Sequence, residues 1–316
     1  MDNVTHLWSK LAMTTQPTLF NWLSILMLGL IWGGTFMVVS IALEGYGPLT
    51  VACARTSLGA ITLLLLVKVM RRPMPRSGVV WGYLVVTGVL NTALPFALLS
   101  WGQQYVPSAF AGISMAALPL FVLPLAHFFA DDRMNLRKMT GVVVGFIGAT
   151  VLIGPAAFDF SEGRLALAQL ACVAASMSYA FSSVLTRRCP PVDSIVMAAL
   201  TLVVGSVVLI PAMLMVEGVP EWVDGRSGYA IIFLGFVPTA FAALLRVQTI
   251  RTAGPVFMTL VNYQVPVWSM VFGAWVLSEV LPLRFFAALA LILLGLAISQ
   301  WASLKSLLMR GSSRRL

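Results

Sequence analysis

The segment GVLNTALPF at residues 88–96 is matched 147 residues further along the chain by GFVPTAFAA at residues 235–243. Three residue types recur at this offset: Gly88, Thr92 and Ala93 fall on Gly235, Thr239 and Ala240. Both segments lie inside long apolar stretches, so the match joins two membrane-type segments rather than two loops. It predicts that the chain consists of two related halves, and this duplication decides the fold.

The same offset aligns the last three predicted helices of each half without a gap. The aligned pairs are Phe110 with Phe257, Pro119 with Pro266, Asp132 with Glu279, Leu136 with Leu283, Arg137 with Arg284 and Gly148 with Gly295. The offset also brings Trp32 onto Tyr179 and Thr35 onto Ser182. Apolar residues align by chance in many membrane proteins, but matched prolines, glycines and an acid–arginine pair indicate a true repeat.

Ten apolar stretches of bilayer-spanning length occupy most of the chain, five in each half. They cover residues 21–43, 48–70, 78–101, 107–129, 138–156, 164–186, 193–216, 228–250, 254–277 and 283–303. A hydrocarbon core about 30 Å thick is crossed by about 20 helical residues, so each stretch can span a bilayer. The chain is 59% apolar and 10% charged, with a mean hydropathy of +0.95, which excludes a soluble globular protein. We predict an all-α membrane protein with ten transmembrane helices.

The basic residues indicate the orientation. With the N-terminus inside, 15 of the 20 lysines and arginines fall in cytoplasmic segments, and the outer loops hold only Arg164, Arg226 and Arg284. Both termini are then cytoplasmic. Because five helices are an odd number, the second five-helix repeat is inverted relative to the first, an arrangement that suits alternating access. The net charge of +9 is therefore a topology signal with some attraction to membrane lipid, and it does not indicate nucleic-acid binding.

These boundaries divide the chain into four segments. We expect a cytoplasmic N-terminal segment at residues 1–20, a first repeat at 21–156, a second repeat at 157–303 and a basic cytoplasmic tail at 304–316. The first apolar run is too long for a signal-peptide core and lacks a convincing cleavage site. It is therefore expected to remain as a membrane anchor.

Several short motifs carry a resemblance to a known family. They are Trp32-Gly33-Gly34-Thr35-Phe36, Pro48 with Arg55, Pro119, Ser178-Tyr179-Ala180, and the run from Thr239-Ala240-Phe241 through Pro266 to Glu279 and Gly295. In this order, and with the duplication, the chain resembles the EamA family of the drug/metabolite transporter superfamily over nearly its whole length. The resemblance implies a ten-helix secondary carrier, often an exporter of amino acids, aromatic ones included, or of other small metabolites.

Two departures from the family pattern bear on these expectations. Asp131-Asp132 stand where many members carry Glu, which concerns helix capping more than substrate. Arg246 replaces the usual apolar or aromatic residue in the eighth span, which argues against a simple apolar pocket.

Polar residues inside the membrane are costly and are functional candidates by default. The candidate substrate-binding residues are Trp32, Thr35, Asn91, Trp101, Tyr179, Asn262, Tyr263 and Gln264. The alternative role for each is hydrogen bonding between helices, or, for Trp101, a place in the interfacial aromatic belt. Because a helix turns about 100° per residue, the side chains of Asn262, Tyr263 and Gln264 cannot all be buried in one helix–helix interface. We therefore expect at least one of these three to face water.

Arg55 and Arg246 are candidate contacts for an anionic group, because a guanidinium binds carboxylates in a bidentate manner. Arg55 lies about 10 Å from the outer end of its span, where pairing with Glu44 or snorkelling to the headgroups is the favoured explanation. Arg246 lies about one turn from the cytoplasmic end of its span, where snorkelling is easy. The pairs Gly29–Gly33 and Gly141–Gly145 predict close helix packing within one protomer more than dimerisation. A monomer is expected, and a dimer stays open.

Two absences in the sequence narrow the mechanism. No phosphate-binding loop is present, so ATP does not drive the protein directly. None of the 11 acidic residues lies at mid-membrane, which favours movement down a substrate gradient over coupling through a buried carboxylate. The two histidines and three cysteines lack metal-ligand spacing, so no metal, cofactor or enzymatic site is expected.

The sequence therefore predicts a secondary transporter of the inner membrane whose partner is a small-molecule substrate. Export of amino acids or related compounds is the favoured function. An importer or exchanger on the same scaffold is the alternative, and a channel is disfavoured because no ring-forming filter motif is present.

Overall fold

The computed structural model describes residues 17–129, 134–154 and 163–301, and all of its elements are helices. The first half contains α2 (Leu19–Leu43), α3 (Pro48–Val69), α4 (Gly78–Gly88), η1 (Val89–Ala93), α5 (Leu94–Gly102), α6 (Ser108–Met115), α7 (Leu118–Phe129) and α8 (Leu136–Ile153). The second half contains α9 (Gly163–Arg188), α10 (Ser194–Val216), α11 (Arg226–Leu234), η4 (Gly235–Phe241), α12 (Ala242–Ala253), α13 (Pro255–Met258), α14 (Val261–Val276) and α15 (Leu283–Ser299). The segments η1 and η4 are π-helical and continue the α-helices on either side.

Eight helical stretches of the described chain are long and apolar enough to cross a membrane. They are Leu19–Leu43, Pro48–Val69, Gly78–Gly102, Ser108–Phe129, Leu136–Ile153, Gly163–Arg188, Ser194–Val216 and Arg226–Ala253. Each coincides with one of the first eight predicted spans. The all-helical membrane class is therefore confirmed, and the eight long helices end within a few residues of the predicted boundaries.

The ninth predicted span, 254–277, is not a single long helix. Gly254 ends α12 with a positive φ of 87°, and a turn separates α13 from α14. The described part of the last span is α15, which has 17 residues and is a shorter apolar helix. Most of the expected N-terminal segment, the C-terminal tail and Asp131-Asp132 lie outside the described residues.

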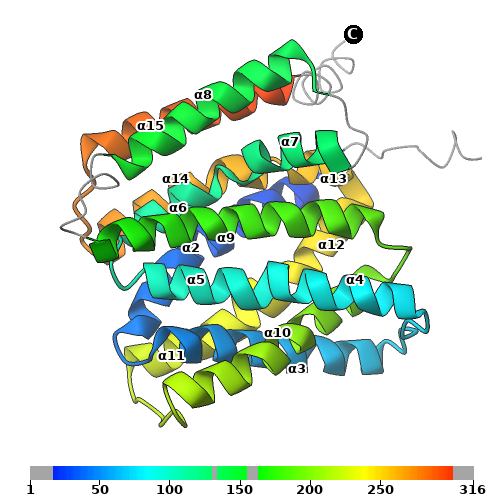
Figure 1. Ribbon diagram of the computed structural model, residues 1–316. Coiled ribbons are helices and arrows are strands. Elements are labelled where there is room, and N and C mark those ends of the chain that lie inside the picture. The colour runs from blue at the N-terminus through cyan, green and yellow to red at the C-terminus, as the bar shows by residue number, and fades with distance from the viewer. Residues whose placement is uncertain (1–16, 130–133, 155–162, 302–316) are drawn as a thin grey trace, which may run out of the picture.

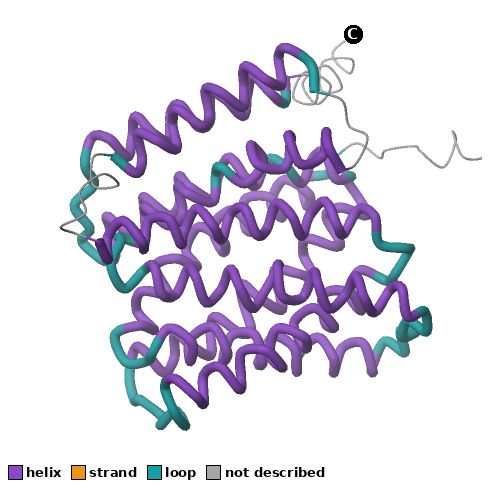
Figure 2. Tube along the Cα trace, viewed as in Figure 1, coloured by secondary structure: helices purple, strands orange, loops and turns teal. Residues whose placement is uncertain are grey.

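Successive long helical stretches cross the bundle in alternating directions between its two ends. Figure 2 shows most of the loops gathered at these two opposite ends. In Figure 1, α8 and α15 lie side by side as an outer layer above the other helices, and they pack closely along their length. The large apolar side chains on the outer surface suit contact with lipid tails; examples are Leu136, Met139 and Leu283.

The main helix contacts join the two halves. The pairs α3 with α10, α2 with α14, α5 with α9, α6 with α14, α7 with α9, and α8 with α15 each bring together one helix from either half. Two of these pairs, α3 with α10 and α8 with α15, are also related by the 147-residue offset. The halves are therefore interleaved, and neither half makes its principal contacts alone.

Glycines allow the closest of these approaches. A Cβ atom added at Gly29 would lie 2.8 Å from Gln264 Oε1, and one at Gly33 would lie 2.9 Å from the Val265 carbonyl oxygen, both on α14. On α8, a Cβ at Gly141 would lie 2.5 Å from the Gly295 carbonyl oxygen of α15. The glycine pairs thus pack helices within one chain, as the sequence predicts.

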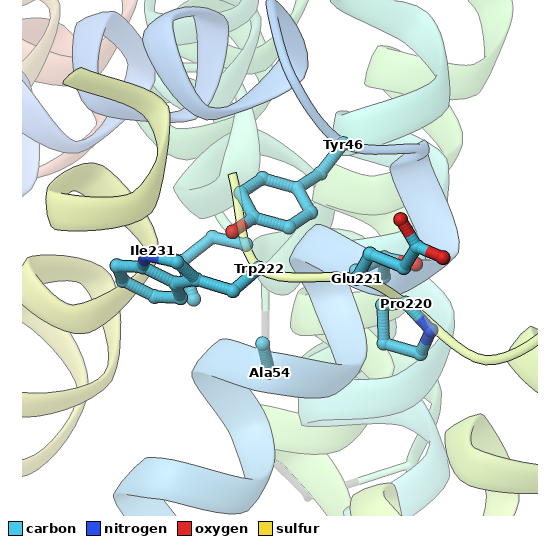
Figure 3. Close-up of a pocket in the computed structure, with 7 residues that line it drawn as sticks. Tyr46, Ala54, Pro220, Glu221, Trp222 and Ile231 are labelled. Atoms are coloured by element: carbon cyan, nitrogen blue, oxygen red, sulfur yellow. The ribbon is translucent and has the colours of Figure 1, made fainter. Parts of the chain in front are cut away.

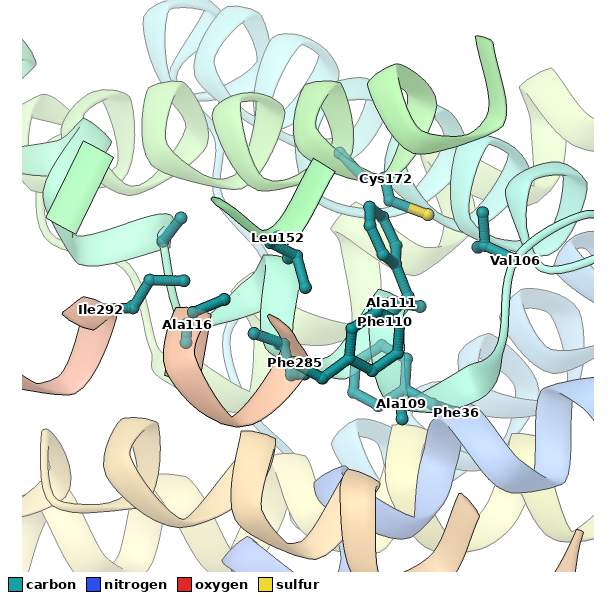
Figure 4. Packing of buried hydrophobic residues seen from close by; sticks show 14 of the residues in the cluster. Phe36, Val106, Ala109, Phe110, Ala111, Ala116, Leu152, Cys172, Phe285 and Ile292 are labelled. Carbon is teal, nitrogen blue, oxygen red and sulfur yellow. The ribbon is translucent and has the colours of Figure 1, made fainter. Parts of the chain in front are cut away.

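The largest buried apolar cluster lies where α6 meets α9, α14 and α15. Figure 4 shows Phe110 and Phe285 at its centre, and their ring centroids are 6.0 Å apart. Phe110 and its counterpart Phe257 are both 1% exposed. Positions that the offset equates therefore occupy equally buried surroundings, although the two clusters around them differ.

Charged side chains join the halves at both ends of the bundle. The Glu217 carboxylate, after α10, accepts hydrogen bonds from Leu49 N and Thr50 N at 2.8 Å and from Thr50 Oγ1 at 2.7 Å, at the start of α3. The Glu279 carboxylate accepts from Ser108 N at 2.7 Å and Ala109 N at 3.1 Å, at the start of α6. Both acids of the second half thus cap helices of the first half, where the helix dipole favours negative charge.

The opposite end of the bundle has a charged cluster of its own. Asp193 Oδ1 caps α10 by accepting from Ile195 N at 2.9 Å. Its Oδ2 lies 3.2 Å from Arg72 Nη1 after α3 and 3.5 Å from Arg251 Nη2 on α12. One carboxylate therefore ties together the ends of α3, α10 and α12.

We predict that Gly33→Ala destabilises the protein, because the added methyl group would collide with Trp268 Cβ and approach the α14 backbone. Overpacking of this kind costs about 1–3 kcal/mol, which thermal unfolding in detergent would detect as a lower Tm. Gly82→Ala is the matched control, since a Cβ there meets nothing within 4 Å. Equal Tm values for the two variants would contradict the close α2–α14 packing.

We also predict that Glu217→Gln lowers stability by about 1–3 kcal/mol, because the neutral amide replaces charge-assisted bonds and turns an NH₂ group toward donors. The measurement is thermal unfolding, with Glu44→Gln as the control because Glu44 is exposed. An unchanged Tm for Glu217→Gln would show that this cap contributes nothing to the fold.

Candidate functional site

The two π-helical segments lie at related positions, because the 147-residue offset carries residues 89–93 onto 236–240. In each segment a threonine hydroxyl donates to a backbone carbonyl: Thr92 to Gly88, and Thr239 to Leu234. π-Helical turns inside longer helices frequently mark functional sites, because they leave carbonyl oxygens without their usual partner. Backbone carbonyl oxygens of η1 and η4 can therefore accept hydrogen bonds from side chains of a neighbouring helix.

A side chain of the other half reaches each segment. Trp32 Nε1 on α2 donates to the Pro238 carbonyl in η4 at 3.2 Å. Ser178 Oγ on α9 donates to the Leu90 carbonyl in η1 at 2.7 Å. Trp32 and Ser178 stand at neighbouring positions of the two repeats, since the offset carries Trp32 onto Tyr179. The contact between α2 and η4 is thus repeated between α9 and η1.

The other predicted site residue of α2 is satisfied within its own helix. The Thr35 hydroxyl is buried and donates to the Ile31 carbonyl at 2.8 Å. It retains only acceptor capacity for any further partner.

Four of the predicted side chains have open polar groups. Asn91 in η1, Tyr179 on α9, and Asn262 and Gln264 on α14 make no side-chain hydrogen bond within the described chain, yet none of their polar atoms is sealed from solvent. A polar group inside lipid must find protein, water or a ligand as partner. The polar atoms of these side chains therefore remain accessible and need a partner from outside the described chain.

Tyr263 differs from its two neighbours on α14. Its hydroxyl is sealed from solvent and has no hydrogen-bond partner within the described chain, and its ring packs against the largest apolar cluster. An unsatisfied buried hydroxyl is unfavourable by about 1–3 kcal/mol. The three consecutive residues thus have different surroundings, as the helical turn requires.

Arg55 occupies an apolar site on α3. Its side chain is 7% exposed, and the guanidinium carbon lies 3.9 Å from the centroid of the Phe96 ring on α5. Tyr179 packs against the buried cluster that contains Phe96. Glu44 is exposed and forms no ion pair with Arg55. Both explanations favoured from the sequence, pairing with Glu44 and snorkelling, are therefore wrong, because the guanidinium stacks on an aromatic ring instead.

Arg246 and Trp101 take no part in this stack. The Arg246 side chain on α12 is exposed and makes no ion pair within the described residues. Trp101, near the end of α5, packs against Tyr105 with ring centroids 5.5 Å apart. Neither residue is held by a hydrogen bond of its side chain in the part of the chain that the structure describes.

Two cavities flank the start of α3, at the end of the bundle that the charge pattern predicts to be outer. One, of about 240 Å³, is lined by Tyr46, Thr50, Ala54, Pro220, Glu221, Trp222 and Ile231 (Figure 3). The other, of about 270 Å³, is lined by Pro48, Leu49, Ala97, Leu98, Trp101, Val216 and Glu217. Trp101 is the one predicted site residue that lines either of these two cavities.

Sequence reasoning missed the residues around these cavities. Glu217, Glu221 and Trp222 follow the predicted span 193–216 and are not among the candidate residues that the sequence singles out. An acid directly after an apolar span was the available signal for Glu217, since such acids often cap a helix. Which helix it caps depends on a contact 168 residues away along the chain.

The arrangement is suited to binding rather than to bond-breaking chemistry. In the described residues, no group of three or more His, Cys, Asp or Glu side chains could hold a metal ion. Amide, phenol and indole groups, together with one guanidinium, are available to hydrogen-bond a small polar molecule.

We predict that Tyr263→Phe leaves Tm equal to or above that of the wild type, because it removes a sealed hydroxyl without a partner. If that hydroxyl binds substrate in another conformation, flux in liposomes should fall although stability does not. Tyr229→Phe is the control, since Tyr229 is 70% exposed. A clear loss of stability in Tyr263→Phe would show that the hydroxyl has a structural partner.

Comparison with known proteins gives a consistent assignment. A family model described as the EamA-like transporter family matches the chain twice, over residues 9–154 and 166–301. The chain is 24% identical to YoaV, an uncharacterized transporter of Bacillus subtilis, over 87% of this chain and 94% of the relative. It is 26% identical to YedA, an uncharacterized inner membrane transporter of Escherichia coli, over 85% of this chain and 87% of the relative.

Two further similarities bear on substrate and fold. The chain is 23% identical to a probable terminal-alkyne amino-acid exporter of Streptantibioticus cattleyicolor, over 79% of this chain and 83% of the relative. A protein of known crystal structure, 19% identical, has a TM-score of 0.63 and covers 92% of this chain and 99% of its own. At that identity the likeness concerns the fold alone.

Proposed function

Because the chain belongs to the EamA-like transporter family, we propose that it exports amino acids or related small metabolites across the bacterial inner membrane by alternating access. The family resemblance carried by the sequence motifs is confirmed. The chain is thus a multi-pass integral membrane protein and a secondary transporter, not an enzyme. The choice of amino acids is supported by the similarity to a probable amino-acid exporter.

The proposal includes ten crossings, two inverted repeats and cytoplasmic termini. Support comes from the helices that pack against their own counterparts, α3 with α10 and α8 with α15. Two inverted units related by a twofold axis in the membrane plane bring such counterparts together at that axis. The matching positions of η1 and η4 support the same relation.

The substrate would bind between the halves, near the open polar groups of Asn91, Tyr179, Asn262 and Gln264, with Trp32 close to η4. The observation that carries the proposal is that these groups, supplied by both halves, are deep within their helices and lack partners in the described chain. A site shared by two interleaved halves changes shape when the halves move, as alternating access requires. Thr35, Trp101, Tyr263, Arg55 and Arg246 complete the candidate set.

The helix caps formed by Glu217 and Glu279 hold the two halves together at the predicted outer end of the bundle. Glu217 and Glu279 join the second half to the first through five hydrogen bonds at the predicted outer end. Opening toward the outside would separate these groups, so the substrate or its gradient has to offset their loss. The sequence contains no ATP-binding loop, and we propose that a substrate gradient drives transport.

We predict that Asn262→Ala lowers saturable amino-acid flux at least tenfold in liposomes that contain only this protein, because a substrate hydrogen bond is lost. Stability and monodispersity should stay unchanged, since the amide has no partner within the described chain. Thr62→Ala is a control in α3, because the Thr62 hydroxyl bonds only the Leu58 carbonyl of its own helix. Wild-type flux from Asn262→Ala would remove this residue from the site.

The same assay decides between the carrier and its alternatives. Saturation with substrate concentration supports a carrier, whereas flux that rises linearly supports a channel. Flux into liposomes loaded with unlabelled substrate, compared with empty ones, separates an exchanger from a uniporter. Absence of saturable flux for every amino acid and related metabolite would overturn the proposed function.

A further inference from the structure

Arg55 is a buried cation for which the described chain supplies no counter-charge. Its side chain is 7% exposed, and no carboxylate of the described residues forms an ion pair with it. Removing a guanidinium from water is costly unless an opposite charge or several acceptors compensate. Stacking on Phe96 at 3.9 Å supplies part of that compensation. The guanidinium of Arg55 therefore needs a counter-charge, and a bound anionic molecule can supply it.

The nearby acidic residues are committed elsewhere. Both Glu217 oxygens accept hydrogen bonds at the start of α3, and Glu44 lies exposed in the loop before it. Tyr179 packs against the same buried cluster as Phe96, but a neutral phenol balances no charge. The packing around Arg55 thus contains an aromatic face and a phenol, with no acid paired to the guanidinium.

The nitrogen atoms of Arg55 show where a partner could bind. Nε is sealed and has no hydrogen-bond acceptor within the described chain. The two terminal nitrogens also make no hydrogen bond there, but they are not among the sealed atoms. Stacking uses the flat face of a guanidinium and leaves the N–H groups along its edge free. That edge matches the two oxygens of a carboxylate.

We propose that the substrate of this transporter carries an anionic group, a carboxylate in the first instance, which binds the free edge of the Arg55 guanidinium beside Tyr179. This inference rests on the proposed function, because it names the chemical class of what the carrier moves. Phe96 acts as a positioning residue that holds the guanidinium plane. Tyr179 can donate its hydroxyl hydrogen to the same carboxylate.

Selectivity follows from this geometry. A substrate with a free carboxylate neutralises the buried charge of Arg55. The corresponding amide or ester offers only an uncharged carbonyl group, so the charge of Arg55 stays uncompensated. Sites with a buried polar group reject analogues that cannot pair with it far more strongly than apolar pockets reject a change of size. The carboxylate should therefore decide recognition, with the rest of the substrate tuning affinity.

The test uses the purified full-length protein in detergent and pairs of compounds of which only one carries the anionic group. The common L-amino acids are compared with their amides, benzoate with benzamide, and benzyl phosphate with benzyl alcohol. Ligands that bind the folded state raise Tm by mass action, and titration gives their Kd. We expect the member with the carboxylate or phosphate to raise Tm at concentrations at which the member without it has no effect.

Variants assign the effect to Arg55. Arg55→Gln should weaken binding of the stabilising anion at least tenfold. Arg226→Gln, an exposed arginine at the start of α11, is the matched control and should bind as the wild type does. Phe96→Leu keeps an apolar side chain but removes the ring, and should weaken anion binding by a smaller factor. If Arg55→Gln does not fold, Arg55→Lys and Phe96→Leu keep the test decisive, because the first retains charge without the planar fork.

Each outcome supports or overturns the inference. Equal stabilisation by the partners that lack the anionic group, wild-type anion affinity in the Arg55 variants, or no stabilising anion at all would overturn it. If benzoate or benzyl phosphate binds through Arg55 while no amino acid is bound or transported, the anion site stands and amino-acid export fails. If amino acids and their amides are transported equally and Arg55→Gln is normal, export stands and the anion site fails.

Discussion

Packing between helices of opposite halves is the constraint on which the rest of the structure depends. Lipid tails are as apolar as the helix surfaces, so helices in a membrane associate through close packing and hydrogen bonds rather than through hydrophobic burial. The glycine at Gly33 lets α2 approach α14, and Gly141 lets α8 approach α15. Because the principal contacts cross between halves, movement of one half alters nearly every buried interface at once. Such a coupling suits a carrier that has two discrete arrangements.

The same interleaving decides which polar groups are satisfied. The carbonyls of Leu90 and Pro238, in the two π-helical segments, are bonded by Ser178 and Trp32 of the opposite half. The side chain of Asn91 lies in one of these segments and has no such partner in the described chain. Satisfied and open polar groups therefore occur in the same π-helical segment: the bonded carbonyl of Leu90 holds the backbone in place, and the amide of Asn91 lacks a partner in the described chain.

Charge follows a similar division. Asp193 is shared by two arginines at one end of the bundle, and Glu217 caps a helix at the other. These carboxylates have partners that hold the described halves together. Arg55 stacks on an aromatic ring and has no anionic partner within the described chain, although it is among the most buried charged side chains there. An arginine with a purely structural role inside a membrane protein is expected to have an acidic partner. The lack of such a partner for Arg55 in the described chain is the basis of the proposed anionic ligand.

The sequence by itself determined the class of protein, the duplication and the first eight long apolar helices, because hydropathy over about 20 residues and a constant offset can be read directly from the chain. It also singled out Asn262, Tyr263 and Gln264, whose spacing on a helix forces different surroundings. Only the tertiary structure decided that Tyr263 is sealed while its neighbours are open, and that Arg55 stacks on Phe96 instead of meeting Glu44. The break before α14 was likewise not foreseen. The hydrogen-bond or stacking partner of a buried polar group depends on which distant helix packs beside it. Hydropathy describes one segment at a time and cannot predict which helices pack together.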